Sequence, residues 1–116
     1  SKSVFEKLLG AEAYKEEAVE SEGVKTVFYQ LGESKLELLE ATDPSSAISK
    51  YLDKNREGFH HLALAVDDIY AEIKRLKKEG FIFINETPKK GADNKLIAFI
   101  HPKSANGILL ELCQDM

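Results

Sequence analysis

Among the acidic and histidine side chains of this 116-residue sequence, Glu37, His61 and Glu111 stand within apolar stretches and are of types that bind metal ions. Both glutamates stand inside apolar stretches, KLELLE at 35–40 and ILLELCQ at 108–114. An ionised carboxylate is costly in such surroundings unless it is paired or binds a metal, although a glutamate that faces solvent from a half-exposed strand costs nothing. One imidazole and two carboxylates suit a divalent ion such as Co²⁺, Mn²⁺, Zn²⁺ or Ni²⁺. The residue types alone leave both interpretations open.

A pair of adjacent histidines, His60 and His61, lies in the apolar stretch FHHLALAV at 59–66. This stretch predicts a strand, in which successive side chains point to opposite faces. We therefore expect only one of the two imidazoles to face the same cavity as the glutamates.

The elements that must position these residues follow from hydrophobic period, glycine turns and helix caps. The first half predicts a helix at 1–9, strands at 13–20, 24–31 and 35–40, and a helix at 45–55. The second half predicts a strand at 59–66, a helix at 69–79 capped by Asp67-Asp68, and strands at 81–86, 95–101 and 107–114. Each half thus has a helix that ends in glycine, followed by three strands, and the last strand carries one glutamate inside its apolar run, Glu37 or Glu111.

This repeated order predicts an α+β fold built from paired βαβββ modules, of which the first lacks its opening strand in this chain. At 116 residues the chain has the length of a single domain. We place module one at 1–42, a linker helix at 43–57 and module two at 58–116.

Composition narrows the possible functions. The formal net charge of −4 disfavours nucleic acid or an anionic membrane as the main partner, and no apolar run is long enough to cross a bilayer. A single cysteine, Cys113, excludes an internal disulfide and favours a cytoplasmic protein. The sequence has neither a CxxC pair nor a glycine-rich phosphate loop.

The segments GFHHLALAVDDI and HPKSANGILLELCQ, together with the paired modules, resemble the vicinal oxygen chelate superfamily, to which glyoxalase I belongs. Within it the HPKS and LLELCQ segments are most similar to the methylmalonyl-CoA epimerases. The resemblance implies that His61, Glu111 and Glu37 are metal ligands. It also implies that Glu111 exchanges a proton with the substrate. Family members begin with a further strand that bears a histidine ligand, which has no counterpart in this sequence.

The implied activity is metal-dependent epimerisation of methylmalonyl-CoA, an acyl-CoA thioester, through a stabilised enolate. The family's second base falls near Thr26, which cannot act as one, so Glu37 is the substitute that we expect. The alternatives are a lactoylglutathione lyase of the glyoxalase I type and, from another class, a metal-free protein of this fold that binds a small ligand. The family also implies a homodimer, and the substrate-binding residues stay unknown.

Overall fold

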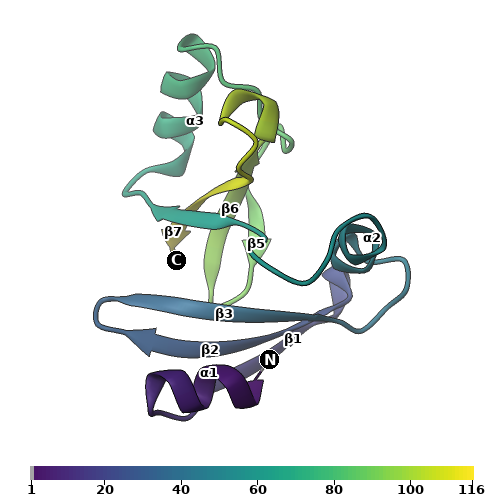
Figure 1. The fold of residues 1–116 in the computed structure, drawn as a ribbon. Helices are drawn as coiled ribbons and strands as arrows, with labels where there is room; N and C mark the ends of the chain where they lie inside the picture. Colours follow the sequence, from purple (N-terminus) through teal and green to yellow (C-terminus); the bar gives the residue numbers. More distant parts are fainter. Residues whose placement is uncertain (1) are drawn as a thin grey trace. The chain divides into compact units, whose positions relative to one another are not determined.

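The computed structural model describes residues 2–116, which form a mixed α+β fold with two sheets. The chain divides into two compact units, Ser1–Glu57 and Gly58–Met116, whose elements are labelled in Figure 1. Within the described residues, no helix has both the length and the apolar character needed to span a membrane.

The first unit consists of a helix, three strands and a second helix. Its sheet has the order β1-β2-β3 with antiparallel pairing throughout. The elements are α1 (Lys2–Leu9), β1 (Lys15–Val19), β2 (Val24–Leu31), β3 (Ser34–Ala41) and α2 (Ala47–Lys54). Gly10 ends α1 with a φ of 66°, and the predicted order of elements is confirmed here.

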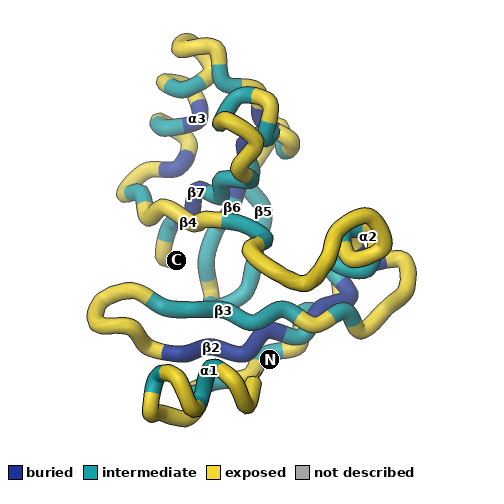
Figure 2. The backbone as a smooth tube through the Cα atoms, in the orientation of Figure 1, coloured by how far each residue is buried: buried dark blue, intermediate teal, exposed yellow. Residues whose placement is uncertain are grey.

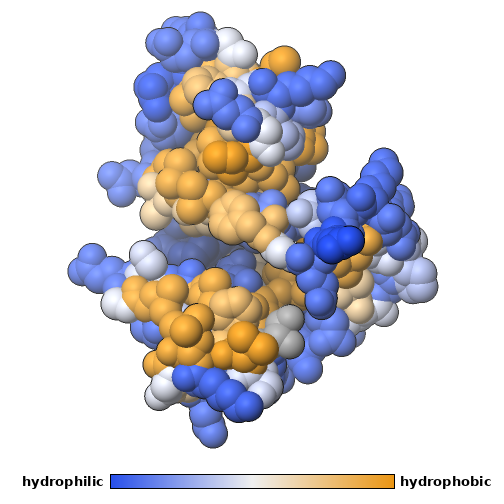
Figure 3. All heavy atoms as spheres, viewed as in Figure 1, coloured by the Kyte–Doolittle hydropathy of each residue, from blue (hydrophilic) through white to orange (hydrophobic). Residues whose placement is uncertain are grey.

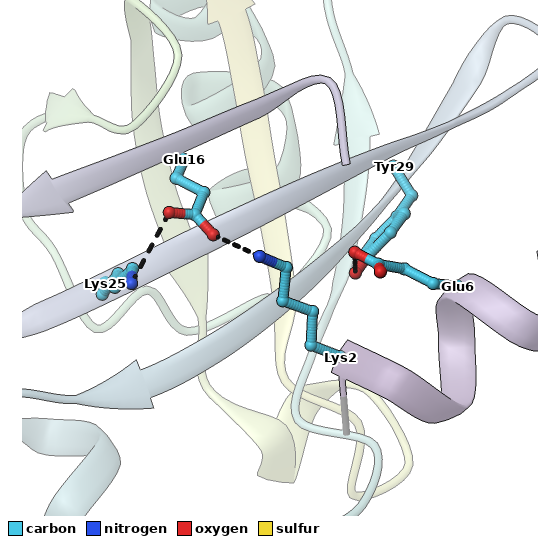
Figure 4. A network of polar contacts seen from close by, with 5 residues as sticks. All are labelled: Lys2, Glu6, Glu16, Lys25 and Tyr29. Carbon is cyan, nitrogen blue, oxygen red and sulfur yellow. Dashed lines mark hydrogen bonds and ion pairs between the residues drawn. The ribbon is translucent and has the colours of Figure 1, made fainter. Parts of the chain in front are cut away.

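Polar contacts fix α1 against one face of this sheet (Figure 4). The Lys2 ammonium lies 2.9 Å from Glu16 on β1, and the Tyr29 hydroxyl on β2 donates to Glu6 at 3.1 Å. Tyr29 is fully buried, and desolvation together with Glu6 raises its pKa. Because neighbouring strand residues point to opposite faces, Phe28 lies on the face away from α1.

The helix α2 begins later than the sequence predicts. Its N-cap is Ser46, whose side chain accepts from the backbone N–H of Ser49, whereas Asp43 forms a turn by accepting from Ser45. Leu52 on this helix is 41% exposed.

The turn before β2 requires glycine at position 23. Gly23 has a φ of 62°, and a Cβ there would lie 2.8 Å from the Cβ of Asp43 and 2.9 Å from the Cβ of Ser46. Its carbonyl also accepts from the N–H of Thr42. The start of α2 therefore packs directly on this glycine.

We expect Gly23→Ala to lower the free energy of unfolding by about 3 kcal/mol, the sum of a left-handed conformation and an overpacked contact. Gly32 is the matched control, because its φ is 61° and nothing lies within 4 Å of the place that a Cβ would take. Gly32→Ala should cost only about 1 kcal/mol. Urea unfolding of both variants measures the difference, and equal losses would contradict the packing argument.

The second unit is a complete βαβββ arrangement. Its elements are β4 (Leu62–Ala65), α3 (Ile69–Lys78), β5 (Lys89–Gly91), β6 (Lys95–Ile100) and β7 (Leu110–Asp115). The sheet order is β4-β7-β6-β5, with β4 parallel to β7 and the other pairs antiparallel. The trio β5-β6-β7 therefore has the same order as β1-β2-β3, and β4 is the additional strand beside the last one.

The helix α3 covers one face of this second sheet. Asp68 caps it as predicted by accepting from the N–H groups of Tyr70 and Ala71, and the Gln114 side chain of β7 accepts from the N–H of Ile69. The core beneath α3 consists of Ile69, Ile73, Phe83, Ala98, Ile100 and Leu112. Figure 2 shows these buried positions on α3, β6 and β7, whereas β4 is exposed along its length.

The strand predicted at 81–86 is wrong. Only Phe83 makes a bridge, to Ile100, and the strand that pairs with β6 is instead β5. Side chains take the place of some of the backbone hydrogen bonds that a paired strand would make here. Ser104 accepts from the N–H of Ile82, and Asn85 accepts from the N–H of Phe99.

Candidate functional site

Glu111 lies on the face of the second sheet that is opposite to α3. Leu112 beside it contributes to the core under the helix, so the period of the strand turns Glu111 to the other face. In the strand register it stands between Phe99 of β6 and Ala63 of β4. A small alanine on one side and an aromatic ring on the other leave the carboxylate half-buried between them.

His61 is brought to this carboxylate by the parallel pairing of β4 with β7. Its Nε2 atom lies 3.8 Å from the Oε1 atom of Glu111, and the two side chains are only 12% and 14% exposed. The imidazole also packs edge-on against Phe99, with ring centroids 6.1 Å apart. The structure thus brings together two of the three predicted ligands.

His60 and His61 do not point to opposite faces, so that expectation is wrong. Their Nδ1 atoms lie 2.9 Å apart and their rings meet edge to face. The reason is that both residues precede the first residue of β4, Leu62, so the alternation of a paired strand does not apply to them.

Burial keeps His61 neutral. Desolvation, with a smaller contribution from the neighbouring His60, lowers the pKa of His61 from 6.5 to about 4. Desolvation also lowers the pKa of His60. The contact between His61 and Glu111 is therefore not an ion pair at pH 7, and His61 has a nitrogen lone pair available for a metal ion.

This shift makes the stability of the metal-free protein depend on pH. The folded-state pKa is the lower one, so between pH 6.5 and 4 the unfolded state binds more protons and stability falls as the pH falls. We expect a loss of about 2 kcal/mol between pH 7 and pH 5 from His61. Urea unfolding in chelator at both pH values measures it, and His61→Gln should flatten the dependence. An equal pH dependence in the variant would contradict the assignment.

Glu37 lies in the first unit, in the middle of β3, and is half-buried. It stands directly opposite Phe28 of β2, on the sheet face away from α1. Glu111 stands opposite Phe99 in the same way, again on the face away from the helix. The two glutamates therefore occupy equivalent positions of the repeat, each facing a phenylalanine.

The two phenylalanines that face these glutamates were not singled out by the sequence patterns. The repeat could have identified them, because the strand before each glutamate-bearing strand contains one at the facing position. In the first unit the ammonium groups of Lys15 and Lys35 lie 5.6 and 5.5 Å from the centre of the Phe28 ring. Thr26 is 2% exposed and stands opposite Leu39, and its hydroxyl is no base at neutral pH.

The donor pair fits a divalent ion. Two donors bound to one ion at about 2.0–2.2 Å lie about 3–3.5 Å apart, close to the observed 3.8 Å between Nε2 and Oε1. Among residues 2–116 as described, no group of three or more histidine, cysteine or acidic side chains forms such a site. A surface depression of about 360 Å³ in the second unit is lined by residues 65–68, Ala71 and Glu72, and the pair lies outside it.

Each unit places a helix on one face of a sheet and a glutamate on the opposite face, and in the second unit an imidazole lies beside that glutamate. Residues 1–99 match the family model of the Glyoxalase/Bleomycin resistance protein/Dioxygenase superfamily. The chain belongs to this superfamily, and the resemblance seen in the sequence is confirmed.

Several proteins to which the chain is similar are methylmalonyl-CoA epimerases. The chain is 41% identical to a mitochondrial methylmalonyl-CoA epimerase of Dictyostelium discoideum over 97% of its own length and 68% of that protein. The methylmalonyl-CoA epimerase structure from Mycobacterium tuberculosis has a TM-score of 0.90 at 33% identity, covering 99% of this chain and 78% of that one. A Streptomyces coelicolor epimerase variant in complex with 2-nitronate-propionyl-CoA has a TM-score of 0.92 at 30% identity, covering 98% and 86%.

Proposed function

We propose that this chain is a methylmalonyl-CoA epimerase, which inverts the carbon between the thioester carbonyl and the carboxylate of its substrate. One observation carries the proposal. The half-buried pair of His61 and Glu111 stands on the sheet face away from α3, in a chain whose relatives over nearly its whole length include epimerases with this substrate.

We propose that Glu111, His61 and Glu37 hold a divalent cation. His61 supplies a neutral imidazole and Glu111 a carboxylate from the same unit. The equivalence of Glu37 and Glu111 opposite their phenylalanines supports Glu37 as a third ligand. When bound, such an ion polarises the thioester and carboxylate oxygens of the substrate and so stabilises negative charge on them. Cobalt, manganese, zinc and nickel all suit this donor set.

The proton chemistry falls to the two glutamates. Glu111 takes the proton from the carbon between the two carbonyl groups, and the electron pair of the broken C–H bond is delocalised onto the thioester oxygen. When Glu37 is protonated and not bound to the ion, it gives its proton to the opposite face of the same carbon, which leaves Glu111 protonated and Glu37 ionised until both exchange protons with water. Carboxylates within hydrogen-bond reach of a carbon acid are suited to this exchange.

We further propose that residues 1–116 act as a single glyoxalase-like domain, with module one at 1–42, a linker helix at 43–57 and module two at 58–116. The homodimer and the cytoplasmic location expected from the sequence are part of the same proposal. Sedimentation of the purified protein tests the dimer.

The test of function is an assay in deuterated water with metal-loaded protein. We expect each epimer of methylmalonyl-CoA to convert to the other and to gain deuterium at the inverted carbon, as followed by NMR. The same preparation should not isomerise the hemithioacetal of glutathione and methylglyoxal. Lyase activity without epimerisation would favour the glyoxalase I alternative. A protein that takes up no metal when metal is supplied and shows neither activity would favour the ligand-binding alternative.

A further inference from the structure

The hydrogen bond between the two adjacent imidazoles carries chemical information about His61. Because the Nδ1 atoms of His60 and His61 lie 2.9 Å apart, one ring must donate an N–H and the other must accept it. A neutral imidazole has only one N–H, so the choice of donor also fixes which nitrogen of each ring carries a lone pair.

The position of Glu111 selects one of the two arrangements. The nitrogen of His61 on the Glu111 side is Nε2, and its distance of 3.8 Å from Oε1 is too long for a proton on Nε2 to be shared with the carboxylate. If Nε2 is instead a metal donor, as in the proposed function on which this inference rests, it must carry the lone pair. The proton of His61 then lies on Nδ1, and His60 must be the acceptor.

We propose that His60 is a positioning residue of the site, which accepts the Nδ1–H of His61 and so holds the His61 Nε2 lone pair on the side of Glu111. Histidine ligands usually donate their second N–H to a carboxylate, a backbone carbonyl or water. Here the acceptor is a second imidazole, which must itself carry its proton on Nε2. This hydrogen bond couples the two tautomers, because a proton on Nδ1 of His61 requires the proton of His60 to lie on Nε2.

If the role of His60 were purely structural, the packing of its ring against His61 would matter and its hydrogen-bond acceptor would not. Its ring packs edge to face against His61, with centroids 5.1 Å apart and an interplanar angle of 85°. A phenylalanine would keep that packing and lose the acceptor. An asparagine would lose the ring and keep an acceptor, because its Oδ1 occupies nearly the position of a histidine Nδ1. The two substitutions separate the two roles.

The first measurement is ¹⁵N NMR of the imidazoles in the metal-free protein at pH 7.5. We expect a proton on Nδ1 of His61 and on Nε2 of His60, and the same tautomers after addition of zinc, with zinc on Nε2 of His61. A proton on Nδ1 of His60, or zinc on Nδ1 of His61, would overturn the proposal. The metal-free spectrum needs neither substrate nor turnover, so it decides the tautomers even if the proposed activity fails.

The second measurement is zinc affinity by calorimetry, with circular dichroism to show that each variant is folded. We expect His60→Phe to weaken binding by about 10–100-fold. His60→Asn should stay within about 3-fold of the parent protein, since it retains an acceptor. Wild-type zinc affinity in His60→Phe, or equal weakening in both folded variants, would show that zinc affinity does not depend on a hydrogen-bond acceptor at position 60. If the parent protein binds no zinc, the proposed metal site fails, and the tautomer measurement still stands.

Discussion

Glu111→Gln is expected to lower epimerase turnover by about three orders of magnitude while leaving the fold intact. Glutamine has the same shape as glutamate but can neither carry a negative charge nor take a proton, so it fails as a base and is a weaker, uncharged ligand. The side chain stands between Phe99 and Ala63, where an amide of the same size fits. Turnover is measured in the deuterium assay, and urea unfolding checks the fold.

Glu86→Gln is the matched control for this prediction. Glu86 is in the same unit, is 88% exposed and contacts only the exposed Lys77 among the ion pairs described. Its removal should leave turnover within about 2-fold, because an exposed ion pair contributes little. Activity of Glu111→Gln close to that of this control would show that Glu111 is a bystander.

His61→Gln is expected to weaken binding of zinc or cobalt by more than about 100-fold, and turnover should fall with metal occupancy. The variant loses an imidazole nitrogen that lies 3.8 Å from the Glu111 carboxylate, and with it one half of the donor pair in this unit. Calorimetric titration with zinc measures the affinity.

His101→Gln is the comparison for the loss of a histidine elsewhere. His101 accepts the backbone N–H of Lys103 and so caps the short 3-10 helix Pro102–Ser104. This variant should bind metal as the parent protein does. If His61→Gln also retained parental affinity, the assignment of His61 as a ligand would be wrong.

Local sequence patterns predicted the helices and strands that are marked by their own caps, turns and hydrophobic period. The strand β2 begins and ends at the predicted residues, and Asp68 caps α3 where an aspartate before an apolar period was expected. The hydrophobic pattern wrongly predicted a strand at 81–86. This apolar run is joined to β6 by one bridge and by side-chain contacts. Alternation within such a run does not reveal which neighbour it pairs with.

Residue types in the sequence could name the donors of the proposed site. Their positions relative to one another could not be predicted from local patterns. Proximity of His61 to Glu111 depends on parallel pairing between strands that are far apart in sequence, which a repeat suggests but a local pattern does not. The contact between His60 and His61 depends on β4 beginning at Leu62, and strand ends are the least predictable part of an element. Glu37 follows from the repeat, and its place in a common site stays a proposal.

The exposure of strand β4 affects how firmly the donor pair of His61 and Glu111 could hold an ion. Four residues, Leu62–Ala65, pair with β7 and all four are exposed, and the N–H of Val66 adds one bond to Cys113. Apolar side chains gather over it on the face seen in Figure 3, so little packing holds it from outside its own sheet. An ion held by both His61 and Glu111 would close a chain loop of about 50 residues and so remove conformational entropy from the opened state. If the proposed ion binds there, opening of β4 would separate its two donors, so the rate at which the strand opens would limit how long the ion stays bound.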